Sequence, residues 1–157
     1  DDRAEDFAAV NGLDQAAQAA IAALPPRIAL RTMGLLGRGN AFLMHGIRRP
    51  SAAVFSRSRA ASAQASQGQA WGQPYEEWKR LVEDFCEANS IGEETRDSVR
   101  ALERTQALRV MGFTSGLRFM VPAESSDVEI EVQARISAAL AGEPMAPVVP
   151  RSATRSE

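Results

Sequence analysis

The chain has 157 residues and a mass of 16.9 kDa, a length that usually makes a single domain. Apolar residues at 45% and charged residues at 24% are ordinary for a soluble globular protein and argue against wholesale disorder, and no apolar run is long enough to cross a bilayer. The formal net charge is −2, and the one cysteine, Cys86, excludes an internal disulfide and a cysteine-based metal site.

Two helices are predicted at the start of the chain. Phe7 and Val10 are interpreted as the end of a first helix, which the beginning of the chain cuts short. Asn11 is placed to cap a second helix over residues 12–24, where small and apolar residues recur on one face. Cys86 lies on the apolar side of a helix predicted further along the chain, so we expect it to be a small residue of the core.

Two more helices and a short extended segment are predicted before residue 67. Pro25 and Pro26 interrupt the second helix, and because proline suits a first turn, a third helix is predicted from there to a glycine-rich stretch. Residues 40–47 are apolar, but the run is too short for a helix, so we expect an extended segment. Ser51 then caps a fourth helix over residues 52–66.

A second set of elements follows a biased segment. Residues 67–73 are rich in Ala, Ser, Gln and Gly and are predicted to be a linker. From Tyr75 onwards, apolar residues recur at spacings of three and four, which predicts a strongly amphipathic helix. Ser90 and Glu93 fit a capping box, and the helix that they start is predicted to run to about Met111.

The last part of the chain repeats the same order of elements. Residues 117–121 are predicted to be a second extended segment. Ser126 and Asp127 cap a final helix, which Gly142 ends. Residues 143–157 are expected to form an extended C-terminal arm that has too few apolar groups to order alone and binds a partner instead.

An internal repeat relates the two sets of elements. A shift of seventy-eight positions without a gap gives fifteen identities, where an unrelated alignment of this composition would give roughly five. The residues that find their identical counterparts are Glu5, Asp6, Phe7, Asn11, Ala23, Leu24, Ala29, Leu30, Arg31, Met33, Gly34, Val54, Arg57, Ala60 and Ala61. We therefore expect a mainly α protein of two tandem four-helix units, residues 1–66 and 74–142. The equivalent core positions would be Phe7 and Phe85, Leu24 and Leu102, and Met33 and Met111.

Charge is distributed unevenly between these predicted units. Residues 1–66 hold eight basic and five acidic groups, whereas residues 67–157 hold ten basic and fifteen acidic groups. No acidic residue lies between Asp14 and Glu76, and the arginines of this stretch are Arg27, Arg31, Arg38, Arg48, Arg49, Arg57 and Arg59. Such a distribution predicts either an anionic partner for the first unit or docking between the two units.

Several of these positions also resemble a known module. Asn11-Gly-Leu-Asp, the helix to Leu24, the two prolines, Met33, and Arg49-Pro-Ser-Ala-Ala-Val with Arg57 resemble a small helical domain that is repeated in many algal proteins. The same residues are similar to the N-terminal acidic domain of heterogeneous nuclear ribonucleoproteins Q and R. The resemblance implies a helical fold, and the algal proteins suggest an organelle such as the plastid, although no targeting signal names a compartment.

The resemblance covers nearly all of the first unit and extends more faintly over residues 75–141. The second unit departs from it at Gly92, where the pattern has Asp, and at Val128-Glu129, where it has Pro-Ser. In the ribonucleoproteins the module precedes RNA-recognition domains, and this sequence contains none. The matching residues are mostly core and cap positions, so they imply a fold more than a function.

No set of residues in the sequence points to catalysis. His45 is the only histidine, which rules out a catalytic triad and a multi-histidine metal site within the chain. The glycines of Gly34–Gly39 have the wrong order for a dinucleotide fingerprint and fit a helix end and turn. Acidic residues cluster in the first turns of predicted helices, where they favour the helix dipole. We therefore expect no enzyme activity, cofactor or metal.

Two hypotheses remain for the arginines. The favoured one is docking to other protein subunits, as a non-catalytic accessory subunit of a larger assembly, for example a photosynthetic or respiratory one. The alternative is an RNA-associated module, which the guanidinium groups suit, although aromatic residues are not interleaved and the pI is about 5.6. Trp71 would either pack within the chain or anchor a partner. The candidate partner-binding residues are Arg27, Arg31, Arg38, Arg48, Arg49, Trp71, Met145, Val148, Val149 and Arg151.

Overall fold

The computed structural model describes residues 2–122 and 127–143, and within these residues it contains eight α-helices and no strand. The mainly α class predicted from the sequence is therefore confirmed. Internal contacts divide the chain into two compact units, residues 1–77 and 78–157. Each unit is described by itself.

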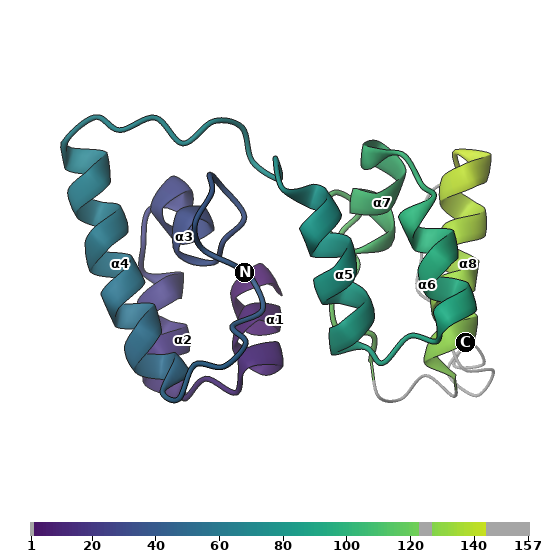
Figure 1. Ribbon diagram of the computed structural model, residues 1–157, viewed down its shortest axis with the longest axis horizontal. Coiled ribbons are helices and arrows are strands. Elements are labelled where there is room, and N and C mark those ends of the chain that lie inside the picture. The colour runs from purple at the N-terminus through teal and green to yellow at the C-terminus, as the bar shows by residue number, and fades with distance from the viewer. Residues whose placement is uncertain (1, 123–126, 144–157) are drawn as a thin grey trace, which may run out of the picture. The chain divides into compact units, whose positions relative to one another are not determined.

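The first unit packs a long helix against shorter ones. Its helices are α1 (Asp2–Asn11), α2 (Gln15–Ala22), α3 (Pro26–Thr32) and α4 (Pro50–Ser66). Figure 1 shows α4 running along α2 and α3, which it contacts, while α1 lies against α2. The core includes Phe7, Leu36, Phe42 and Val54, which are fully buried. The rings of Phe7 and Phe42 meet edge to face, with centroids 5.3 Å apart, and so join α1 to the loop between α3 and α4.

Helix starts in the first unit follow local signals, but two predicted caps are wrong: Asn11 is not the N-cap of α2, and Ser51 lies inside α4, whose N-cap is Arg49. Asp14, not Asn11, is the N-cap of α2, and its Oδ1 accepts a hydrogen bond from the backbone N–H of Ala17 at 2.8 Å. α3 and α4 begin at Pro26 and Pro50, because a first-turn proline loses no helical hydrogen bond. Asn11 instead ends α1.

The side chain of Asn11 ties α1 to the following loop. Its Nδ2 donates to the carbonyls of Phe7 and Phe42, both at 2.9 Å, and its Oδ1 accepts from the N–H of Met44 at 2.7 Å. Residues 40–47 are therefore an irregular loop, and the prediction of an extended segment is wrong. Its backbone groups pair with side chains from helices and not with a neighbouring strand.

The segment predicted as a linker belongs to the first unit. Trp71 is only 7% exposed and packs with Leu36 and Ala61. Leu36 also forms an isolated bridge with Pro74, and the N–H of Tyr75 donates to the carbonyl of Leu35 at 2.8 Å. These contacts move the boundary from the predicted linker to the junction of Glu77 and Trp78. The segment is polar and glycine-rich in composition, so its composition did not indicate that one large apolar side chain, Trp71, fixes it in place.

The second unit has the same number of described helices. They are α5 (Trp78–Ala88), α6 (Glu93–Arg100), α7 (Arg104–Val110) and α8 (Val128–Ala141). α8 contacts α6 and α7, and α5 contacts the same two helices. Leu81, Phe85, Val99 and Met111 are buried in its core. Phe85 and Phe119 meet edge to face with centroids 5.3 Å apart.

Two predictions about helix ends fail in this unit. Gly92 is the N-cap of α6 and offers no side chain, so the predicted capping box of Ser90 and Glu93 does not form. The predicted helix to Met111 is broken after Arg100, and α7 starts at Arg104 with Glu103 as its N-cap. The N–H of Glu103 donates to Oε1 of Gln106 at 3.0 Å.

The two ends of α8 are as predicted. Asp127 is its N-cap and accepts from the N–H of Glu129 at 2.9 Å. Gly142 ends it in the left-handed conformation, with φ 72°. Residues 117–121 form an irregular loop, so the second predicted extended segment is also absent from the described residues. The side chains of Asn89 and Arg135 bind its backbone.

The predicted core positions are buried to different degrees. Phe7, Phe85, Met33 and Met111 are at most 1% exposed, and Leu102 is 6% exposed. Leu24 is half-buried at the end of α2. Cys86 is also in the core, as predicted, and burial raises the pKa of its thiol to about 11.

Candidate functional site

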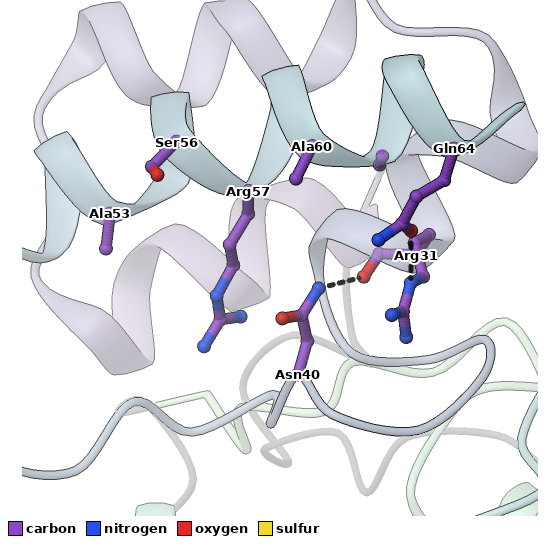
Figure 2. Close-up of a pocket in the computed structure, with 8 residues that line it drawn as sticks. Arg31, Asn40, Ala53, Ser56, Arg57, Ala60 and Gln64 are labelled. Atoms are coloured by element: carbon purple, nitrogen blue, oxygen red, sulfur yellow. Dashed lines mark hydrogen bonds between the residues drawn. The ribbon is translucent and has the colours of Figure 1, made fainter. Parts of the chain in front are cut away.

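A polar hollow beside α4 is the most distinctive surface feature of the first unit. Its volume is about 280 Å³, and Figure 2 shows its lining residues beneath the helix. The lining consists of two arginines, two amide side chains and a strip of small residues of α4, namely Arg31, Asn40, Ala53, Ser56, Arg57, Ala60, Ala61 and Gln64. The hollow is thus rich in hydrogen-bond donors and lacks a carboxylate.

Arg31 lies in the last turn of α3 and is held there by several acceptors. Its Nε donates to Oε1 of Gln64 at 3.4 Å, and its Nη1 donates to the carbonyls of Leu36 and Arg38. The guanidinium carbon lies 5.8 Å from the ring centroid of Trp71, a cation–π distance. These contacts fix the positive charge at one end of the hollow, as Figure 2 shows for the bond to Gln64.

Arg57 provides the second guanidinium. It projects from the middle of α4, and its Nη1 donates to the carbonyls of Thr32 at 3.1 Å and Ala41 at 2.9 Å. Asn40 lies beside it in Figure 2 and donates to the carbonyl of Arg31 at 2.8 Å. Arg57 thereby joins α4 to the end of α3 and to the middle of the loop that follows it. Ala53, one turn earlier on α4, also lines the hollow and contributes only a methyl group.

The second unit contains an arginine with closely similar hydrogen bonds, but the space beside it is filled. Nη1 of Arg135 donates to the carbonyls of Val110 at 2.8 Å and Arg118 at 3.0 Å. Its Nε donates to Oε2 of Glu131 at 3.2 Å, and the two side chains are 2% and 1% exposed. Glu131 precedes Arg135 by four residues, just as Ala53 precedes Arg57. In the second unit a buried carboxylate thus contacts the arginine four residues after it, whereas the residue at that spacing in the first unit, Ala53, lines the hollow.

The structure brings some of the predicted site residues together. Arg31, Arg38 and Trp71 are neighbours, and all three also line a second depression beside the hollow. The side chain of Arg38 is 85% exposed and pairs with Glu77 at 3.1 Å. Trp71 packs inside the unit, so of the two roles considered for it, the structure shows internal packing.

The remaining predicted residues lie elsewhere or outside the described chain. Arg27, Arg48 and Arg49 are exposed and do not line the hollow, and Arg49 is the N-cap of α4. Four predicted residues lie outside the described residues, namely Met145, Val148, Val149 and Arg151. The arginines are thus divided between an exposed group and a group held in the hollow.

Sequence reasoning predicted only Arg31 among the eight lining residues and missed the other seven, four of which are polar. Asn40, Gln64 and Arg57 were not among the predicted site residues, although Arg57 is one of the identities of the internal repeat. A signal was present in the sequence. Arg57 and Arg135 are identical at this position of the repeat, but the residue four positions earlier is Ala53 in one case and Glu131 in the other, which is a difference in local charge.

The chemistry of the hollow suits binding. Two guanidinium groups with amide and hydroxyl neighbours can hold an oxygen-rich ligand through charge-assisted hydrogen bonds. Within residues 2–122 and 127–143, no three His, Cys, Asp or Glu side chains are grouped to hold a metal ion. The same residues contain no helix that is both long and apolar enough to span a membrane.

Comparisons with models of protein families, with curated proteins and with solved structures give no match to this chain.

Proposed function

We propose that the two units are copies of one four-helix module. The register supports this, since α2 and α6, α3 and α7, and α4 and α8 each begin seventy-eight positions apart. Side-chain contacts support it too, because Asn89 donates to the carbonyls of Phe85 and Phe119 and accepts from the N–H of Val121, much as Asn11 does in the first unit. A difference between the copies then becomes informative about function.

The function that the site supports best is docking to another protein, as a non-catalytic accessory subunit of a larger assembly. The observation that carries this proposal is the hollow lined by Arg31 and Arg57, in a stretch of the first unit with no acidic residue between Asp14 and Glu76. A partner with acidic groups would be attracted by the positive potential of these arginines and held by their fixed guanidinium groups. The exposed Arg27, Arg48 and Arg49 extend the basic surface around it.

An RNA-associated module is the second candidate, and one observation favours it. Phe55 is 37% exposed on α4, one turn before the exposed Arg59, so an aromatic face and a cation lie near each other. Support is weaker than for docking, because the only tryptophan of the first unit is buried. A single exposed ring offers less stacking surface than single-stranded RNA usually requires.

Retention of partners by the tagged full chain tests the docking proposal. We expect protein partners to co-purify at about 50 mM salt and to be lost at about 500 mM, where the Debye length is short. Replacing Arg48 and Arg49 by Glu should reduce retention strongly. The matched control reverses two exposed charges of the second unit, Lys79→Glu and Arg104→Glu, and should change retention little.

Three outcomes separate the candidates. Loss of partners after nuclease treatment would support the RNA alternative, with affinity that falls steeply with salt. A chain that purifies alone even at low salt would contradict docking. Equal losses in both charge-reversed pairs would show that only net charge matters, and the first unit would have no special role.

A further inference from the structure

We infer that the hollow beside α4 receives a glutamate or aspartate side chain from an extended acidic segment of a partner protein. This inference rests on the proposed docking function and gives it a position and a ligand chemistry. It starts from the difference between the two units: the carboxylate that the second unit supplies from its own helix is missing from the first.

The paired arginines make the comparison specific. Arg57 and Arg135 each donate through Nη1 to two loop carbonyls, one at the end of the preceding short helix and one farther along the loop. Only the second unit adds Glu131 at 3.2 Å from the Nε of its arginine. The side chain of Ala53 is shorter than Glu by a methylene and a carboxylate, and the hollow opens at that point. Space for a carboxylate is therefore present in the first unit where the second unit contains one.

Arg57 already has other interactions, so what the hollow offers a carboxylate is space and not an unpaired guanidinium. A carboxylate that enters beside Ala53 would lie near Arg57 and near the polar side chains of Ser56 and Asn40. A carboxylate held by a guanidinium and by neutral donors is a common way to satisfy four lone-pair positions. The lining includes no acidic group that would repel it.

The shape of the hollow favours a peptide over a single small anion. Its α4 lining runs from Ala53 to Gln64, which at 1.5 Å per residue is about 16 Å of helix. An extended peptide of about five residues has this length. Arg31 lies near the Gln64 end, so a second acidic side chain along the same segment would meet a second guanidinium.

The test compares two adjacent alanines of α4. Ala53→Glu places a carboxylate in the hollow, whereas Ala52→Glu adds the same charge on the exposed side of the helix. The probe is an acetylated five-residue peptide, Glu-Ala-Ala-Ala-Glu amide, and its control has Gln in place of Glu. Binding to the full chain is followed by the NMR signals of the Nε–H groups of Arg31 and Arg57.

For the unchanged chain we expect saturable shifts of both arginine signals with the acidic peptide and none with the glutamine peptide. Ala53→Glu should weaken binding by about tenfold or more, because its own carboxylate occupies the site, while Ala52→Glu should weaken it by less than about threefold. Equal weakening in the two variants, or no shift at the two arginines in the unchanged chain, would overturn the inference.

Partner retention that depends on Arg48 and Arg49 while the peptide fails to bind would leave docking in place and remove only the assignment of the hollow.

Discussion

Asn11, which the sequence predicts as a helix cap, and its counterpart Asn89 serve instead as clamps between a helix and a loop. Asn89 is 9% exposed and makes three hydrogen bonds, at 3.0, 3.0 and 2.8 Å, to the backbone of Phe85, Phe119 and Val121. Asn11 makes the corresponding bonds in the first unit but is only half-buried. An amide side chain suits both places, because it donates and accepts at once and carries no charge.

Replacing Asn89 by Ala should therefore destabilise the second unit. The carbonyl of Phe119 and the N–H of Val121 lose their bonds to the amide side chain, while the carbonyl of Phe85 keeps its bond from the backbone N–H of residue 89. Leaving such buried groups unsatisfied costs about 1–3 kcal/mol. Asn11→Ala should cost less, since water can reach its partners. Urea denaturation measures both, with Gln133→Ala as the control, because Gln133 is exposed and donates only to Thr95. Equal and negligible changes for both asparagines would show that the clamps are not needed.

At the scale of helices, the sequence predicts elements better than their exact ends. The prolines at 26 and 50 and Gly142 act through the backbone, and Asp127 caps α8 with its own side chain, so these local effects could be anticipated. The break before Arg104 could not, because Glu103 has no such local signature and its cap depends on the side chain of Gln106. Glutamate is not among the usual N-cap residues, so this helix end had no recognisable signal.

The candidate site was only partly predictable for the same reason. The excess of arginine in the first unit is visible in the sequence, and two of the predicted residues, Arg31 and Arg38, are neighbours in the structure. The hollow itself depends on the absence of a carboxylate beside Arg57, because residue 53 is an alanine that has only a methyl group. That comparison needs the contacts of Arg135 and Glu131, which spacing alone does not reveal.

The turn after α7 gives a prediction at the scale of an element. Gly112 has φ 90°, and a Cβ there would collide with the backbone carbonyl of Leu117. Gly116 has a similar φ of 82°, but a Cβ there would meet nothing within 4 Å. Gly116→Ala should therefore cost only the strain of a left-handed alanine, about 1–2 kcal/mol.

Gly112→Ala should cost that strain plus an overlap worth about 1–3 kcal/mol, because the loop must move away from α7. The free energy of unfolding in urea measures the difference between the two variants, which share the same backbone conformation. If both alanines destabilise the chain equally, the close approach of the loop to Gly112 does not constrain the fold.

At the scale of the molecule, the boundary between the units changes the charge balance. With the boundary after Glu77, the first unit has eight basic and seven acidic residues and the second has ten and thirteen. The contrast is smaller than the sequence division indicated, because Glu76 and Glu77 belong to the first unit. What distinguishes the first unit is thus the local grouping of its arginines more than its net charge.

The comparison between a hollow in one unit and a carboxylate in the other requires that each unit is a complete module with its own core. Denaturant unfolding of the separate chains 1–77 and 78–157, followed by circular dichroism, tests this claim most directly. We predict that each chain is helical and unfolds cooperatively by itself, because each buries its own aromatic pair, Phe7 with Phe42 and Phe85 with Phe119. Chains that are unfolded when separate and become helical only when mixed would contradict it.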